Sequence, residues 1–496
     1  MRKKHGPMRP DTLRQSMNGA KQAVVLAFIR DYRDLAVQVG RVQWRQFFEA
    51  GGTNKYATAK HLNGICGAAP VQMASYQVQE QIDGWASNRA NEFADCVRRS
   101  KLPDATKAQL HAVNRKAAWF SREPMEDIDQ AMRALARSIM RHVMGKHRRP
   151  DLSRISPRLD SRIATLARAN KANHADLWAT LRLPNRDRVA IPLHGNPQFA
   201  RRGGDLCPVV QLCTDAVRGV TVRLVQDMTK VFAALKAAYV PRMGSLGIDF
   251  GLSTLMATSE GTMFGRGLIG DLKRVDKQIV GIARHRMRSG GKPRDSLRYR
   301  NLITRLRGML KSRINAALNS IVRVHAPASL VVERLDFRHP GLSRRMNRLL
   351  TNCGRAVFRQ KLADLHDKFS ISSTEVPSPY TSQECSSCGY VDARNRTSQS
   401  RFVCRWCGNA KHADVNAGCV VTQRRSLGLD AKGLGKAVIL DALVSRHVTR
   451  WPGTWPKGLP GAARDPRLSN PYFKGGVGTA RNALRTQGLV PCDLKQ

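Results

Sequence analysis

Four cysteines arranged as two CxxC pairs are the residues whose spacing most clearly predicts chemistry. They are Cys385 and Cys388 in the first pair, and Cys404 and Cys407 in the second, separated by residues 389–403. Two such pairs at this distance are typical of a tetrahedral Zn²⁺ site with four thiolate ligands. Four protein ligands leave no open position on the metal, so we expect a structural ion that holds a small zinc ribbon together.

Three carboxylates lie in surroundings where an acidic side chain has no evident structural purpose. Asp249 interrupts the apolar run 247–251, Glu333 follows Leu330–Val332, and Asp414 comes just after the second CxxC pair. Each residue alone has a common alternative, a turn or helix-cap role. The nearest competing acid, Asp336, is interpreted as an edge or salt-bridge residue.

Without paired histidines near them, three carboxylates predict hard oxygen ligation, and hence Mg²⁺ or Mn²⁺. Carboxylates that converge on two such ions perform phosphodiester hydrolysis. The sequence shows no Ser-His-Asp constellation, phosphate-binding loop or dinucleotide fingerprint that would compete with this interpretation. We therefore predict that Asp249, Glu333 and Asp414 are the catalytic metal ligands.

The elements around these carboxylates follow an RNase H-like order, which is strand, strand, strand, two long basic helices, strand, helix, strand, and a final helix. Such a sheet places the first ligand on its first strand, the second at the end of its fourth strand, and the third on a later helix. The predicted strands span 246–251, 255–260, 262–265, 330–335 and 371–376, and the paired helices span 266–288 and 295–324.

The chain upstream of these elements divides into two regions with different sequence patterns. Residues 12–145 repeat apolar side chains at helical spacing, whereas short apolar runs between turn residues from about 150 to 243 predict a small antiparallel barrel or sheet. Residues 451–478 are rich in Pro and Gly, which predicts a poorly ordered tail, with ordering on bound nucleic acid as the alternative. The predicted domains are 1–150, 151–243, 244–379, 380–410 for the ribbon, 411–425, and the tail 426–496.

Charge predicts the partner. The 496 residues contain 84 Lys and Arg against 37 Asp and Glu, a net charge of +47. A polyanion best compensates such a charge, and nucleic acid is favoured over a membrane surface because no basic amphipathic anchor stands out. Only 6% of residues are aromatic, so we expect few stacking platforms for bases.

The cysteines and the apolar segments predict the compartment. The chain has 11 cysteines, and the seven outside the CxxC pairs show no paired framework, which predicts a reducing compartment with most of them as small core residues. No apolar stretch approaches the roughly 18 residues of a membrane span, and residues 24–29 are too short for a signal sequence. We expect a soluble cytoplasmic protein.

Taken in order, the motifs resemble the RuvC nuclease of the TnpB family and of its descendants, the compact type V CRISPR effectors. The resemblance covers about 244–425. It is carried by Gly-Ile-Asp-Phe-Gly, Val-Val-Glu-Arg-Leu, Tyr-Thr-Ser-Gln before the first CxxC pair, Arg-Phe before Cys404, and Ala-Asp-x-Asn-Ala around Asp414.

The resemblance implies a prokaryotic RNA-guided DNA nuclease whose partners are a guide RNA and a double-stranded DNA target. It implies a multidomain α+β fold with a helical recognition lobe, a β-barrel wedge domain and an RNase H-like nuclease into which the zinc ribbon is inserted. The protein would read a short motif beside the target while base pairing reads the sequence. Arg401, just before Cys404, is a candidate phosphate contact.

Two departures favour a compact CRISPR effector over a transposon protein. The helical region before the predicted barrel is larger than in a minimal TnpB, with no N-terminal strand evident before it, and the basic tail lies outside the recognisable pattern. Two alternatives to a guided nuclease stay open. One is an RNA-guided DNA-binding protein that silences targets without efficient cleavage. The other is a transposon-associated protein that binds DNA without RNA.

Overall fold

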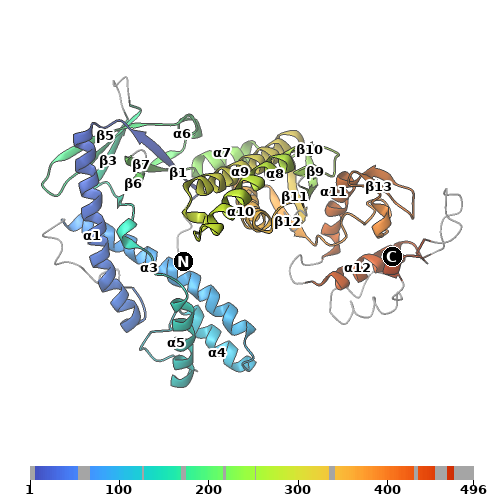
Figure 1. The fold of residues 1–496 in the computed structure, drawn as a ribbon, viewed down its shortest axis with the longest axis horizontal. Coiled ribbons are helices and arrows are strands. Elements are labelled where there is room, and N and C mark those ends of the chain that lie inside the picture. Colours follow the sequence, from blue (N-terminus) through green and yellow to red (C-terminus); the bar gives the residue numbers. More distant parts are fainter. Residues whose placement is uncertain are drawn as a thin grey trace. The chain divides into compact units, whose positions relative to one another are not determined.

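The computed structural model contains two compact units, Met1–Val231 and Phe232–Gln496 (Figure 1). The structure describes residues 6–53, 67–125, 128–168, 175–215, 219–251, 253–333, 341–428, 434–452, 466–467 and 469–473. Asp336, Cys66 and Cys492 lie outside these ranges.

Helices form one part of the first unit. The longest are α1 (Gly19–Ala50) and α3 (Ala68–Arg99), which pack against each other through apolar residues at three- and four-residue spacing. The Asn18 carboxamide oxygen caps the start of α1 by accepting from the Lys21 N–H at 2.9 Å, and the Tyr32 hydroxyl donates to Gln77 at 2.8 Å between the helices. The unit also contains α4 (Asp104–Arg115), α5 (Gln130–Gly145), η2 (Leu152–Arg154) and α6 (Pro197–Arg202).

A seven-stranded antiparallel sheet forms the other part of this unit, in the order β2-β6-β7-β1-β5-β4-β3. The recorded pairings leave β2 and β3 as edges among the described residues, so closure into a barrel stays a prediction. The strands are β1 (Met8–Gln15), β2 (Arg158–Leu159), β3 (Ala164–Arg168), β4 (Leu177–Arg182), β5 (Arg188–His194), β6 (Asp205–Asp215) and β7 (Gly219–Asp227).

The strand β1 corrects two sequence-based expectations, because an N-terminal strand is present and it belongs to the sheet rather than to the helical region 1–150. It lies between β7 and β5 and pairs with both, for example through Leu13 with Val222 and Arg14 with His194. Leu13 is its single fully buried residue, so the strand has almost no apolar alternation to detect. Hydrogen bonds to two distant partners, rather than local pattern, make this segment a strand.

A five-stranded sheet is the centre of the second unit, in the order β10-β9-β8-β11-β12. Strands β10, β9 and β8 are mutually antiparallel, whereas β11 is parallel to both β8 and β12. The order of these strands and their connecting helices along the chain is the order predicted from the sequence. The strands are β8 (Met243–Phe250), β9 (Met256–Thr258), β10 (Met263–Phe264), β11 (Pro327–Glu333) and β12 (Ser372–Val376).

Helices connect the parallel strands. Because parallel neighbours need a crossover, α8 and α9 link β10 to β11, and α10 links β11 to β12. Their apolar faces bury against the inner residues of β8 and β11, including Leu246, Ile248 and Val332. The helices are α7 (Thr229–Ala238), which begins in the first unit, then α8 (Leu268–Arg288), η3 (Pro293–Asp295), α9 (Leu297–His325) and α10 (Arg344–Phe369).

Two glycines bring the helix α11 (Ala413–Arg424) into direct contact with this sheet. A Cβ atom on Gly247 of β8 would lie 2.2 Å from the Gly418 carbonyl oxygen, and one on Gly418 would lie 2.9 Å from the Ser259 nitrogen. Neither position has room for a side chain, so backbone packs on backbone. Because α11 packs this closely on the sheet, its first turn lies near the end of β8.

Part of the segment 426–496 forms a helix rather than the poorly ordered tail predicted. Helix α12 (Lys436–Arg450) buries Ile439 and Leu443 against Val391 of the cysteine-rich region. The remaining elements are η4 (Ala393–Asn395), β13 (Arg401–Val403), β14 (Ala410–His412), η5 (Arg425–Leu427) and η6 (Pro471–Phe473). Among the described residues, no helix combines the length and apolarity needed to cross a bilayer.

Candidate active site and cysteine metal centre

The three predicted carboxylates line one cleft of about 330 Å³. Asp249 lies near the end of β8, and Glu333 ends the neighbouring parallel strand β11, whose Val332 is in register with Ile248. Asp414 lies in the first turn of α11. Residues that are far apart in the sequence therefore meet at the same edge of the sheet, as the sequence predicted.

Burial and mutual repulsion dominate the electrostatics of this cleft. Burial raises the pKa of Asp249 well above its usual range, and the nearby carboxylates of Glu333 and Asp414 raise it further. Burial also raises the pKa of Glu333 to about 7, although the Thr381 hydroxyl opposes this shift by donating to Glu333 Oε2 at 3.1 Å. Either protonation or a bound cation relieves this repulsion.

The donor set fits a hard divalent cation such as Mg²⁺ or Mn²⁺, because it consists of carboxylate oxygens, and no described residue lining the cleft offers a sulfur or imidazole ligand. The carboxylate oxygens are more widely spaced than the thiols of the cysteine cluster. That cluster is the one group of three or more Cys, His, Asp or Glu, among the described residues, whose ligand atoms all lie within 4.8 Å of one another.

One cation of the chain already faces the cleft. Arg396 donates to Asp414 Oδ1 at 3.3 Å and to the Gln399 carbonyl oxygen at 2.6 Å, and Gln399 Nε2 donates to Ser253 Oγ at 2.8 Å. The loop 396–399 of the cysteine-rich region thus lies over the carboxylates. Arg396 is a residue that the sequence analysis missed.

The predicted phosphate contact, Arg401, does not line this cleft. Its side chain is exposed on β13, and its backbone N–H donates to Ser398 Oγ at 3.1 Å. No local pattern separates Arg396 from its neighbours Arg394 and Arg401, because all three lie in a short polar segment. Arg396 reaches the cleft because of the path of the loop in three dimensions, which the local sequence does not show.

The four predicted zinc ligands form the tight cluster. The Sγ atoms of Cys385 and Cys407 are 3.7 Å apart, and those of Cys388 and Cys404 are 3.6 Å apart, as tetrahedral thiolate ligands of one ion require. The donor set fits Zn²⁺, which would cross-link the two halves of the ribbon.

The two CxxC turns have the same backbone geometry. Each is followed by a glycine with positive φ, Gly389 at 77° and Gly408 at 71°, whose N–H donates to the carbonyl oxygen of the first cysteine at 2.9 Å and 3.0 Å. Glycine adopts this left-handed conformation without steric cost. The repeated turn aims both cysteines of each pair toward a common point.

Helix α11 fixes the ribbon to the carboxylate site. Asn416, two residues after Asp414, accepts from the Ser386 N–H at 3.0 Å and donates to the Glu384 carbonyl oxygen at 2.8 Å. The fully buried carboxylate of Glu384 pairs with Arg424 at 2.8 Å at the other end of the helix. One helix therefore carries a carboxylate of the cleft and holds the first CxxC turn.

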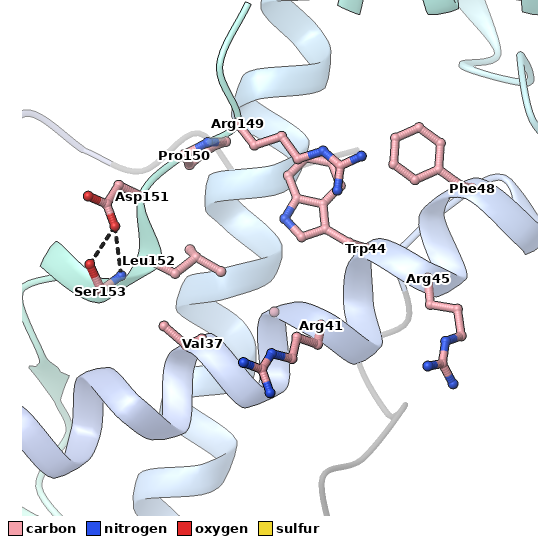
Figure 2. Close-up of a pocket in the computed structure, with 11 residues that line it drawn as sticks. Val37, Arg41, Trp44, Arg45, Phe48, Arg149, Pro150, Asp151, Leu152 and Ser153 are labelled. Carbon is pink, nitrogen blue, oxygen red and sulfur yellow. Dashed lines mark hydrogen bonds between the residues drawn. The ribbon is translucent and has the colours of Figure 1, made fainter. Parts of the chain in front are cut away.

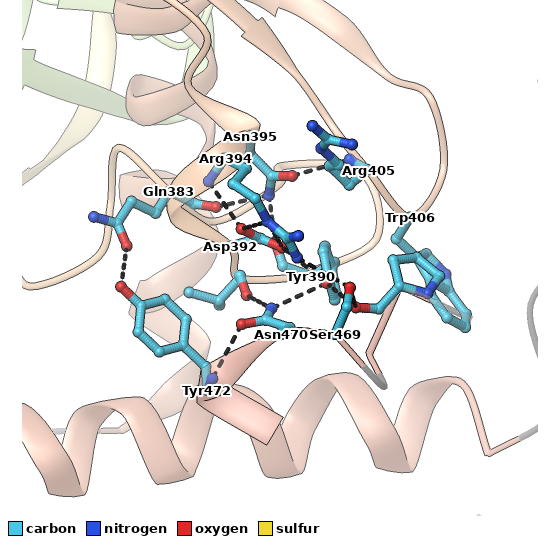
Figure 3. A network of polar contacts seen from close by, with 12 residues as sticks. Gln383, Tyr390, Asp392, Arg394, Asn395, Arg405, Trp406, Ser469, Asn470 and Tyr472 are labelled. Carbon is cyan, nitrogen blue, oxygen red and sulfur yellow. Dashed lines mark hydrogen bonds and ion pairs between the residues drawn. The ribbon is translucent and has the colours of Figure 1, made fainter. Parts of the chain in front are cut away.

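The described residues 466–467 and 469–473 form a strap across the ribbon (Figure 3). Asn470 is 1% exposed and donates to the Tyr390 hydroxyl at 3.0 Å and to the Val391 carbonyl oxygen at 2.8 Å. Tyr472 donates to Gln383 at 2.9 Å, and the Arg467 guanidinium lies 4.3 Å from the centre of the Trp406 ring. Several side chains of the strap therefore contact the ribbon.

We expect Asn470→Ala to lower the free energy of unfolding by about 1–3 kcal/mol, because it removes the side-chain donor of the buried Val391 carbonyl oxygen and one of the hydrogen bonds of the Tyr390 hydroxyl. Chemical denaturation followed by zinc release measures the effect. Asn185→Ala, in an exposed turn, is the matched control. Equal stability of the two variants would refute a stabilising role for the strap.

The remaining cysteines correct a further expectation. Five of the seven outside the cluster are described, and none forms a disulfide, in agreement with the prediction. None is fully buried, however, whereas most were expected to be core residues. Cys353 packs at the border of the apolar core of the second unit, whereas Cys96 is exposed. The five are Cys96, Cys207, Cys213, Cys353 and Cys419.

Comparison with known proteins identifies the relatives of this chain. Residues 356–421, which include all four cysteines, Arg396 and Asp414, match the family model of the Cas12f1-like TNB domain. The chain is 38% identical over 71 residues to the CRISPR-associated endodeoxyribonuclease Cas12f1 of Sulfoacidibacillus thermotolerans. It is 26% identical over 195 residues to the putative RNA-guided DNA endonuclease InsQ of Escherichia coli (strain K12). The predicted resemblance to the TnpB and compact type V nucleases is confirmed.

The matches with these TnpB and type V relatives are partial. They cover 14% of this chain and 17% of the Cas12f1 protein, and 36% of this chain and 48% of InsQ. A solved structure of the mini-RNA-guided endonuclease CRISPR-Cas_phi3 aligns over 87% of this chain and 94% of that one, at 12% identity and a TM-score of 0.46. Asp249 and Glu333 lie outside the TNB match.

Proposed function

We propose that this protein is an RNA-guided DNA endonuclease that hydrolyses phosphodiester bonds with two divalent metal ions. The observation that carries the proposal is the meeting of Asp249, Glu333 and Asp414 in one cleft, beside a four-cysteine cluster that matches a TNB domain. The names of Cas12f1 and InsQ support the same activity and the same class of substrate.

In this proposal the carboxylates bind the catalytic ions, and other side chains orient them. Bound Mg²⁺ would activate the attacking water and stabilise the leaving oxygen. Thr381 holds one oxygen of Glu333, and the contact of α11 with β8 keeps Asp414 near Asp249. The zinc ribbon would hold target nucleic acid and position the loop that carries Arg396 over the cleft.

The resemblance to the type V nucleases also suggests which parts of the protein bind the guide RNA and the DNA target. We propose that the helices α1, α3, α4 and α5 form the recognition lobe, and that the seven-stranded sheet forms the wedge domain that reads a short motif beside the target. The net charge of +47 supports binding of both a guide RNA and a DNA duplex. Arg401 remains a candidate contact to phosphate outside the cleft.

The proposal is tested by purifying the protein with its associated RNA, sequencing that RNA, and incubating the complex with plasmids carrying the matching target. We expect cleavage that requires both the RNA and Mg²⁺. A protein that co-purifies without RNA and binds DNA unaided would instead support the transposon-associated alternative.

Arg396→Gln should lower the rate of cleavage by about 10–100-fold while leaving target binding nearly unchanged. A guanidinium beside the carboxylates is able to stabilise phosphate charge in the transition state, a contribution of a few kcal/mol in comparable sites. Single-turnover cleavage and filter binding measure the two effects. Arg405→Gln, at an exposed arginine of the ribbon outside the cleft, is the control, and equal losses in the two variants would contradict the role of Arg396.

The ion pair between Arg396 and Asp414 also favours the second candidate, a guided DNA-binding protein with inefficient cleavage. In this arrangement a cation of the chain occupies one oxygen of the third carboxylate. Arg396→Gln separates the two candidates, because it would raise cleavage if the pair blocks the site and lower it if Arg396 serves the reaction.

A further inference from the structure

A cavity of about 640 Å³ lies in the first unit, between α1 and the segment 149–153 (Figure 2). It is separate from the carboxylate cleft and combines aromatic with cationic side chains, in a chain that has few aromatic residues. Its lining includes Arg41, Trp44, Arg45, Phe48, Arg149 and Asp151.

The aromatic wall is preorganised. Trp44 and Phe48 are four residues apart on α1, and their rings stack with centroids 5.9 Å apart and an interplanar angle of 19°. Trp85 of α3 supports Trp44 from another side, edge to face, at 5.3 Å. The Arg149 guanidinium lies 4.9 Å from the Trp44 centroid and 5.0 Å from that of Phe48, and Figure 2 shows it extended over the Trp44 ring.

A close contact holds the opposite wall in place. A Cβ atom on Gly40 would lie 2.2 Å from Leu152 Cδ1, so the absence of a side chain on α1 lets Leu152 reach the helix. Leu152 is 8% exposed and anchors the segment that carries Arg149. The cavity therefore has two fixed walls.

The cavity is electropositive. Arg41, Arg45 and Arg149 are exposed, and among the residues that the structure describes none of the three has a carboxylate partner. The single acid in the lining, Asp151, accepts from Ser153 at 2.6 Å and 3.1 Å and pairs with Arg154 at 3.2 Å. Its charge is compensated outside the cavity, so the three guanidinium groups are available to an anionic ligand.

We propose that this cavity binds one unpaired nucleotide of a single-stranded nucleic acid. Trp44 is 9% exposed and the exposed Arg149 guanidinium lies over its ring, so the base would stack on that guanidinium, which Trp44 and Phe48 support from behind. Arg41 and Arg45 would contact the adjoining phosphates. Flat, sequence-tolerant stacking combined with guanidinium groups is the chemistry by which proteins hold single strands. A base pair within a duplex keeps its faces covered by its neighbours and does not fit this arrangement.

The test measures binding without cleavage, so it is independent of the proposed nuclease activity. The full-length Asp249→Ala protein is titrated with fluorescent single-stranded RNA and DNA oligonucleotides of one length and mixed sequence. We expect Arg149→Met and Phe48→Leu each to weaken binding by about tenfold. The double variant of Arg41 and Arg45 to Gln should lower the slope of log affinity against log salt by about 2. Arg30→Gln, on the same helix but outside the cavity, is the control.

A second measurement uses the unaltered cavity. Oligonucleotides with 5-iodouracil are irradiated on the Asp249→Ala protein, and the crosslinked peptides are sequenced. Crosslinks to Trp44 or Phe48 support the site. Comparison of the crosslinking yields of RNA and DNA oligonucleotides identifies which of the two the site binds. The proposal is overturned if no crosslink falls on α1 and if the cavity variants bind like Arg30→Gln.

Discussion

Asp249→Asn is expected to lower target cleavage by at least about a thousandfold, which corresponds to about 4 kcal/mol of transition-state stabilisation. Asn keeps the size of the side chain but removes the negative charge that a divalent cation requires. Because the carboxylates of Glu333 and Asp414 both act on Asp249, its loss weakens the whole ligand set. Single-turnover cleavage of a guided plasmid at saturating Mg²⁺ measures the effect.

Loss of activity in this variant should not reflect unfolding. In Mg²⁺-free buffer at alkaline pH, Asp249→Asn should be at least as stable as the unaltered protein, because burial and the neighbouring Glu333 and Asp414 disfavour the charged form of Asp249. Since the pKa of Asp249 is raised in the folded state, ionisation of this carboxyl destabilises the fold. The difference should therefore shrink as the pH falls toward the ordinary pKa of an aspartate, about 4.

The matched control is Asp367→Asn, which changes a carboxylate on α10 that lies outside the cleft. It should cut DNA at the normal rate. Normal cleavage by Asp249→Asn, at saturating Mg²⁺, would remove Asp249 from the catalytic site and with it the two-metal proposal.

Cys404→Ser is expected to abolish binding of the structural Zn²⁺ and, as a consequence, DNA cleavage. Structural zinc contributes about 10–16 kcal/mol of apparent binding free energy, which the few apolar residues of the ribbon do not replace. The ribbon carries the loop of Arg396 and is tied to α11 through Asn416, so its unfolding disturbs one side of the carboxylate cleft. Metal analysis of the purified variant should show zinc falling from about one ion per chain to none.

Cys96→Ser is the control for this experiment, because Cys96 is an exposed cysteine of α3 in the first unit. It should retain both zinc and cleavage. The Asp249→Asn protein should also retain its zinc, which separates the structural metal from the catalytic ones. Full activity of a zinc-free Cys404→Ser protein would show that the ribbon does not position the site.

The local sequence was sufficient to predict those features that short residue patterns determine. The CxxC pairs predicted a four-thiolate cluster because ligand spacing within a turn is a local property, and each pair carries the glycine that the turn needs. The apolar runs around Asp249 and Glu333 predicted buried strands, and the order of elements predicted that both ends would meet. Strand order follows from connection length and handedness, which the sequence largely determines.

Tertiary structure alone decided which other residues reach these sites. β1 is a strand because β5 and β7 supply hydrogen bonds from nearly two hundred residues away in the chain, and its own pattern is nearly featureless. The path of a loop brought Arg396 rather than Arg401 to the cleft, and the strap is held on the ribbon by its contact with Tyr390. These contacts depend on the packing of distant segments, and no periodicity or spacing within either segment encodes them.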